Sequence, residues 1–221
     1  MKPKIRLSLA ILSFLSALAG LSFLLWRGDP LAYESPSYRV VEKLSGVELR
    51  AYEPYRVAEV TVDGELETAG SRGFRILAKY IFGDNEGKRK IAMTAPVSQE
   101  KSEGSRVAMT APVTQEKAGD RYTIQFMMPS DYSRDELPRP RDRRISIREL
   151  PARTFAAIRY SGTWSEQNYR KHLEQLMSTL RAEGYEPVGE PIWARYNPPF
   201  MPWFLRRNEI LTAFRARGSA S

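Results

Sequence analysis

Two stretches of this sequence repeat their apolar residues with a period near 3.6, and segments that alternate with a period of 2 flank both of them. Within residues 68–82, apolar residues fall at i, i+3, i+4, i+7 and i+8 from Phe74. Residues 164–184 contain a second such stripe, and a glycine, Gly83 or Gly184, ends each stretch. The pattern predicts two amphipathic helices, each packed against a sheet through one face.

The alternating segments predict short, half-buried strands on both sides of each helix. The expected strands cover residues 47–52, 55–62, 121–128, 144–150, 154–160, 191–196 and 209–214. The order is strands, helix, strands, and then the same again. This order predicts an α+β fold in which two similar halves each bring one helix to a mostly antiparallel sheet. With enough strands, such a sheet can curl into one barrel with the helices outside.

The first 27 residues are typical of a membrane-targeting segment. Residues 7–26 are uncharged and mostly apolar, and Lys2, Lys4 and Arg6 precede them. About 20 apolar residues suffice for a helix to cross a bilayer, so we expect an uncleaved anchor. The basic flank predicts an extracytoplasmic domain, periplasmic in a bacterium. The alternative is a signal peptide cleaved at residues 17–19, which would release a secreted domain.

The remaining chain divides into three parts by composition. Residues 28–37 contain Asp29-Pro30 and Ser35-Pro36, which break helices and strands and indicate a linker. Residues 38–215 are expected to form one folded domain, and residues 216–221 a flexible tail.

The composition excludes several kinds of chemistry. The chain has no cysteine, so disulfides, thiol nucleophiles and zinc–thiolate sites are excluded. Its one histidine, His172, has no visible catalytic partner, and we predict neither an enzyme nor a metal site. Half of the net charge of +8 lies in residues 1–27. The rest of the chain is only mildly basic, and we therefore predict no nucleic-acid binding.

A short repeat lies in the middle of the chain. Residues 91–101 recur as residues 107–117 with nine of eleven positions identical. Two short copies do not make a solenoid. We expect a strand pair around the loop 102–106, with Pro96 and Pro112 at an edge or bulge because proline cannot donate to a ladder.

Five motifs in this order resemble the SOUL heme-binding family. They are LRAYEPY at 49–55, GFRILAKYIFG at 73–83 with KIAMTAPV at 90–97, FMMP at 126–129, ARYNPP at 194–199 and RRNE at 206–209. The resemblance covers residues 38–214. It implies a distorted eight-stranded barrel of two related halves, flanked by two helices, that binds heme or another tetrapyrrole. It also implies a pocket between the first helix and the loop at residues 198–207.

The residues of these two elements suit a flat apolar ligand with two carboxylates, because they combine apolar faces with cations. The expected pocket residues are Arg75, Ile76, Lys79 and Tyr80 from the helix, and Phe200, Met201, Trp203 and Arg206 from the loop. Met201 and Tyr80 are the candidates for an axial ligand, since His172 lies outside both elements.

Two alternatives concern the same loop, which is unusually rich in aromatic residues for a surface segment. The loop either forms part of a binding site or packs back onto the barrel as a plug. If it is exposed, it also suits a non-enzymatic protein-interaction or scaffold module, in which its aromatic side chains would contact a protein partner.

Overall fold

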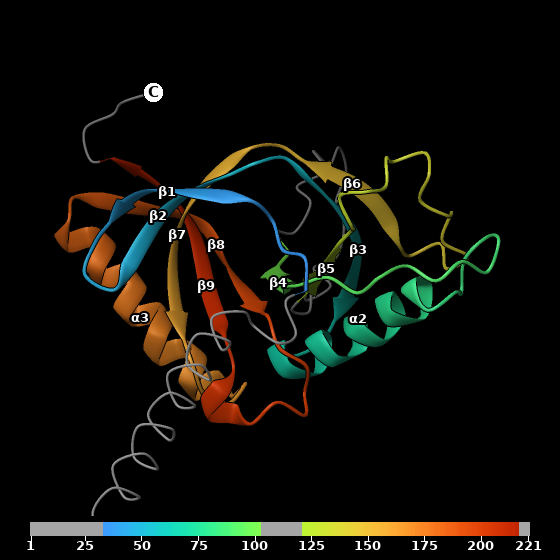
Figure 1. The fold of residues 1–221 in the computed structure, drawn as a ribbon. Helices are drawn as coiled ribbons and strands as arrows, with labels where there is room; N and C mark the ends of the chain where they lie inside the picture. The colour runs from blue at the N-terminus through green and yellow to red at the C-terminus, as the bar shows by residue number, and fades with distance from the viewer. Residues whose placement is uncertain (1–32, 103–120, 217–221) are drawn as a thin grey trace, which may run out of the picture. The chain divides into compact units, whose positions relative to one another are not determined.

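Nine strands and two long helices make up the described part of the chain, residues 33–102 and 121–216 of a computed structural model (Figure 1). The strands are β1 (Tyr38–Lys43), β2 (Val47–Tyr52), β3 (Tyr55–Asp63), β4 (Val97–Lys101), β5 (Arg121–Met127), β6 (Ser146–Leu150), β7 (Arg153–Tyr160), β8 (Tyr185–Arg195) and β9 (Asn208–Ala216). The helices are α2 (Leu66–Ile81), α3 (Glu166–Ala182) and the short 3-10 turn η1 (Trp203–Leu205).

All nine strands belong to one curled antiparallel sheet with the order β1-β2-β7-β9-β8-β4-β5-β3-β6. The order repeats itself about the β8–β4 pair: β6-β3-β5-β4 on one side corresponds to β2-β7-β9-β8 on the other. The α+β class and the mostly antiparallel sheet are therefore confirmed. The expected count of eight strands is corrected to nine among the described residues, because β1 adds to the edge of β2.

Helix α2 packs on β3 and β5 through the stripe that its period predicted, except at Phe82, which follows the helix and is exposed. Leu77 and Ile81 are buried against Val60 and Ile124. Gly73 lets the helix come unusually close, because a Cβ at this position would lie 2.6 Å from Ile124 Cγ1. The close approach of the helix to the sheet therefore depends on a residue without a side chain.

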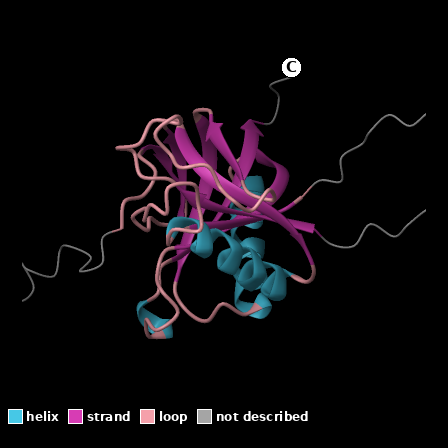
Figure 2. Cartoon of the chain, turned by 90° about the vertical axis from the view of Figure 1, so that its right-hand side faces the viewer, coloured by secondary structure: helices cyan, strands magenta, loops and turns pink. Residues whose placement is uncertain are grey.

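Helix α3 packs on β7, β8 and β9. Leu176 and Leu180 are buried against Ile158 and Ile210. The helix begins two residues later than Trp164, because Ser165 is the N-cap and its hydroxyl accepts a hydrogen bond from Asn168 N. Both helices lie on the same face of the sheet (Figure 2).

The opposite, concave face of the sheet holds a separate apolar cluster. It contains Tyr52, Phe155, Ala157, Ala194 and Leu211. Side chains alternate between the two faces along each strand. Neighbouring residues in the sequence therefore serve either the helix-covered face or the concave face.

Two sequence expectations fall on residues outside the described part. Strand β4 pairs with β5 on one side and β8 on the other. The second half of the expected strand pair, residues 107–117, lies outside the described part. Within residues 33–102 and 121–216, no helix is both long enough and apolar enough to cross a membrane. The expected anchor at residues 7–26 is not among these residues.

The contact of Gly73 with Ile124 predicts the effect of a methyl group. In Gly73→Ala, the new Cβ would clash with a fully buried isoleucine, and overpacking of this kind costs about 1–3 kcal/mol. The gain in helix propensity, about 1 kcal/mol, offsets only part of that cost. We expect the free energy of unfolding to fall in urea titrations. Ser71→Ala, on the exposed side of the same helix, is the control and should unfold like the parent. Equal stability of all three proteins would contradict this packing.

Candidate functional site

The connection between β8 and β9 exposes a group of large apolar side chains. Phe200 is 79% exposed, Trp203 57%, Phe204 59% and Leu205 50%. The rings of Trp203 and Phe204 meet edge to face with centroids 5.5 Å apart. Of the two alternatives for this loop, a plug does not describe these four side chains, because each has about half or more of its surface in solvent.

The loop is held in shape by Arg206. Its Nε donates to Met201 O at 2.8 Å, and its Nη2 donates to Pro199 O at 2.7 Å. Both bonds run from the end of the loop to its middle, so the arginine fixes the turn that presents the aromatic residues. Met201 is half-buried inside this turn.

Arg206 also begins a stack of alternating cations and aromatic rings. Its guanidinium carbon lies 4.3 Å from the centre of the Trp164 ring. The guanidinium carbon of Arg195 also lies over the Trp164 ring, 5.1 Å from its centre. The same carbon lies 4.1 Å from the centre of the Trp193 ring. Cation–π contacts of this kind are strongest where water is excluded.

Burial lowers the pKa of Arg195 to about 10, because the charged form loses hydration. No ion pair to Arg195 occurs among the described residues. The structure thus places two arginines, Arg195 and Arg206, beside the aromatic loop with tryptophans rather than carboxylates as their partners.

A hollow of about 420 Å³ lies next to the loop. One wall is Trp203. The other lining residues precede α3 or lie in its first turns, and they are Ser161, Gly162, Thr163, Ser165, Gln167, Asn168 and Lys171. The backbone bond from Gly162 N to Trp203 O, 3.0 Å long, ties the loop to this wall. The hollow combines an aromatic wall with a lysine at its rim.

The expected helix residues lie in different surroundings. Arg75 and Lys79 are exposed, and Ile76 packs partly against the core below α2. Tyr80 is fully buried and its hydroxyl donates to Pro138 O at 2.9 Å. Because this hydroxyl lies in the core and already has a partner, Tyr80 is not presented to a ligand in this structure.

It is the first turn of α2 that lies near the start of α3. Glu166 N donates to Glu67 Oε1 at 3.3 Å. A helix rises about 1.5 Å per residue, so Tyr80 lies roughly 20 Å along the axis from Glu67. The loop residues Phe200, Met201, Trp203 and Arg206 come together. Within the described part of the chain, no hydrogen bond or ring contact joins them to the later half of α2.

Sequence reasoning missed Trp164, Arg195 and Lys171. Arg195 lies in the 194–199 motif, which was the one signal pointing to it. The stack of Trp164 on Arg195 joins residues 31 positions apart, and no periodicity indicates such a contact. His172 lies on α3, where its ring stacks on Tyr160 with centroids 4.2 Å apart.

These features describe an α+β protein whose curled sheet carries two helices on one face and an exposed aromatic loop beside them. The sequence matches the profile of the SOUL heme-binding protein family over residues 33–213, and the chain belongs to this family.

Two curated relatives agree with this assignment. The chain is 29% identical to Heme-binding protein 2 of Mus musculus over 192 residues, covering 80% of this chain and 88% of that protein. It is 26% identical to Heme-binding protein 1 of Xenopus laevis over 166 residues, covering 74% and 80%. Among solved structures, the C-terminal domain of EcmrR is similar with a TM-score of 0.55 and 13% identity, over 81% of this chain and 98% of that one. At this identity the likeness concerns the fold alone.

The burial of Tyr80 predicts how stability depends on alkaline pH. Burial raises the pKa of Tyr80 from 10.0 to about 12, because the phenolate would lose its hydration. The unfolded chain therefore releases this proton first, and the contribution to stability is lost as the pH rises from 10 to 12.

Urea unfolding followed by tryptophan fluorescence at several pH values measures this loss. Tyr80→Phe is expected to lower stability at neutral pH by about 1 kcal/mol, because the bond to Pro138 O is missing. The same variant should lose less stability between pH 10 and 12 than the parent. An identical alkaline slope in both proteins would show that Tyr80 is not buried as described.

Proposed function

We propose that this chain binds heme or a related tetrapyrrole through the loop at residues 197–207 and the hollow beside Trp203. The observation that carries the proposal is the exposure of Phe200, Trp203, Phe204 and Leu205 in one loop. Monomeric proteins rarely leave such a group uncovered without a partner. Membership of a heme-binding family supports a flat apolar ring as that partner.

The energetics of the loop suit such a ligand. Covering one of these side chains completely contributes about 2 kcal/mol, so a ring that covers two or three of them gains a useful affinity. The loop does not have to reorganise, because Arg206 already holds its turn through two backbone carbonyls.

The polar end of a tetrapyrrole requires cations at the edge of the site. Lys171 lies at the rim of the hollow, and Arg206 lies beneath the loop against Trp164. Carboxylates bind such groups through charge-assisted hydrogen bonds. Met201 remains the candidate axial ligand in the loop, since methionine sulfur is a known ligand of heme iron.

Hemin titration of loop variants tests this site. Trp203→Ala removes the wall shared by the loop and the hollow, and we expect the dissociation constant for hemin to rise about tenfold. The measurement is the saturable change of the Soret absorption with protein added.

Phe82→Ala is the matched control, because Phe82 is also an exposed aromatic residue, 62% accessible, but lies at the end of α2. Its hemin affinity should stay unchanged. A loss on Phe82→Ala and none on Trp203→Ala would move the site to the α2 residues Arg75, Lys79 and Tyr80. Absence of any spectral change in the parent would refute tetrapyrrole binding.

The exposed loop equally favours a protein-interaction or scaffold role, the second candidate function. In that case Trp203→Ala would remove copurifying protein partners while the affinity for hemin stayed at the parent value. Measuring both quantities on the same variant separates the two functions.

We also propose that residues 7–26 tether the domain to a membrane, with the domain on the extracytoplasmic side. The length of the apolar run and its basic flank support this. The full chain should sediment with membranes and remain there after washing with high salt, whereas a chain lacking residues 1–32 should not. A mature chain that begins just after residue 19 would instead identify a cleaved signal peptide.

A further inference from the structure

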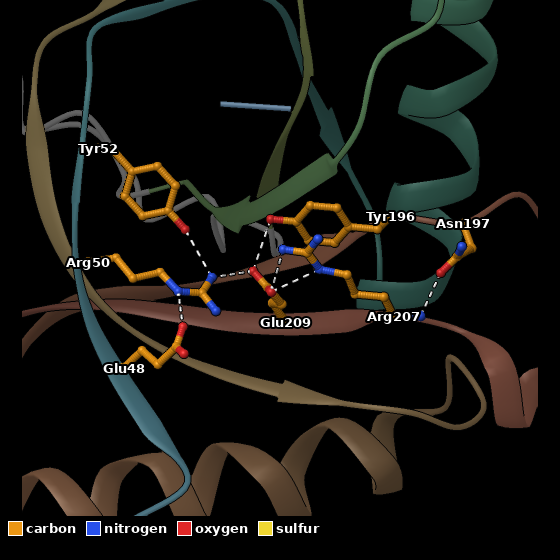
Figure 3. A network of polar contacts seen from close by, with 7 residues as sticks. All are labelled: Glu48, Arg50, Tyr52, Tyr196, Asn197, Arg207 and Glu209. Carbon is orange, nitrogen blue, oxygen red and sulfur yellow. Dashed lines mark hydrogen bonds and ion pairs between the residues drawn. The ribbon is translucent and has the colours of Figure 1, made fainter. Parts of the chain in front are cut away.

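The concave face of the sheet contains a buried carboxylate with an unusual set of partners (Figure 3). Glu209 of β9 has no exposed surface. Its Oε2 accepts from Arg50 Nη1 at 2.7 Å and from the hydroxyl of Tyr196 at 2.9 Å. Its Oε1 accepts from Nε and Nη2 of Arg207 at 3.0 and 2.8 Å. The carboxylate of Glu48 accepts a hydrogen bond from Arg50 Nε at 2.8 Å.

Each oxygen of the Glu209 carboxylate therefore accepts two hydrogen bonds, and neither is left to bind a cationic ligand. The surrounding tyrosines stay neutral, because burial raises the pKa of Tyr52 to about 12 and that of Tyr196 well above 10.0. One nitrogen of each arginine, Nη2 of Arg50 and Nη1 of Arg207, makes no hydrogen bond within the described residues. Donors thus remain available beside the network.

A cavity of about 320 Å³ that opens to solvent lies against these two arginines. Its lining includes Tyr38, Lys43, Glu48, Arg50, Arg159 and Arg207. Four of these residues are cations, and only Glu48 and the buried Glu209 oppose them, so two positive charges are in excess. Lys43 and Arg159 are exposed at the rim and form no ion pair within residues 33–102 and 121–216.

From this geometry we infer that the concave face binds a small organic dianion, a phosphate ester or a dicarboxylate, at the cavity lined by Lys43, Arg50, Arg159 and Arg207. Guanidinium groups bind carboxylates and phosphates through paired hydrogen bonds, and their planar shape matches both. The cavity volume lies at the small end of the range of ligand sites, roughly 300–1,000 Å³. The ring of Tyr38, on which Arg50 packs at 4.5 Å, supplies an apolar wall.

This site is separate from the loop proposed for the tetrapyrrole. Arg206 stacks on Trp164, which lies on the face covered by the helices, whereas Arg207 reaches Glu209 on the concave face. Adjacent residues therefore serve opposite faces of the sheet. The inference does not depend on tetrapyrrole binding, and the two proposals can fail independently.

Calorimetric titration of the full chain at low salt tests the inference with two probes, phenyl phosphate and succinate. We expect one-to-one binding of at least one of them, and the stronger of the two identifies a phosphate or a dicarboxylate as the preferred group. The monoanion benzoate should bind more weakly than either. Raising the salt concentration should weaken binding, because mobile ions screen the rim charges.

Rim variants keep the test independent of folding. Lys43→Gln and Arg159→Gln remove exposed charges and leave Arg50, Arg207 and Glu209 intact. Each should weaken probe binding roughly threefold, and the double variant about tenfold, since partly exposed charge pairs contribute modestly. Arg143→Gln, in the exposed loop before β6, is the matched control with the same change of charge and should bind as the parent does.

Three results would overturn the inference. The first is that neither probe binds, and the second is that the rim variants bind the probe as tightly as the parent does. The third is that Arg143→Gln weakens probe binding as much as the rim variants do, because that result would indicate unspecific attraction to a basic protein. Hemin affinity should be unchanged in the double rim variant. Loss of hemin binding there would show that the cavity belongs to the tetrapyrrole site instead.

Discussion

The buried carboxylate of Glu209 is the constraint on which most of this structure depends. A fully buried charge is tolerated only when it is paired and hydrogen-bonded, and removing one partner typically costs about 3–5 kcal/mol. Glu209 meets this condition with Arg50 of β2, with Arg207, which immediately precedes β9, and with Tyr196, which immediately follows β8. Arg50 reaches it from the far side of β7, on the face where that strand carries the small residue Ala157.

The same network also fixes both ends of the aromatic loop. Tyr196 N donates to Arg207 O at 3.2 Å, and Arg207 N donates to the side-chain oxygen of Asn197. The residues that hold the carboxylate are therefore the residues at which the loop begins and ends. The loop between Asn197 and Arg207 can therefore expose Phe200 and Trp203 without disturbing the sheet.

The local parts of this fold were predictable from the sequence, whereas its long-range parts were not. A stripe such as Phe74, Leu77 and Ile81 appears within a few residues, and α2 follows it closely. The pairing of Arg50 with Glu209 joins residues 159 positions apart, and neither residue shows a pattern that points to the other. Strand β1 was missed because Val40 and Val41 are consecutive apolar residues, both exposed on an edge strand, and do not alternate with polar ones.

The candidate site likewise has a local part that the sequence indicates and a long-range part that it does not. The density of aromatic residues at 197–207 is a local property, and the exposed loop agrees with it. The helix residues were selected by type, as cations and apolar side chains on α2, but type does not tell which turn of a helix borders a distant loop. The contact of Glu67 with Glu166 places the first turn of α2 near the start of α3, and such a tertiary contact leaves no local pattern in the sequence.

The alternation of side chains along the chain then explains how one short segment serves two surfaces. Arg206 and Arg207 are chemically identical, yet one packs on Trp164 and holds the loop, while the other neutralises Glu209 on the opposite face. Because successive side chains of an extended strand point to opposite sides, a shift of the register by one residue would turn Arg207 and Glu209 together to the helix-covered face. It would separate the buried carboxylate from Arg50 of β2. The register that satisfies Glu209 is therefore also the register that presents the aromatic loop.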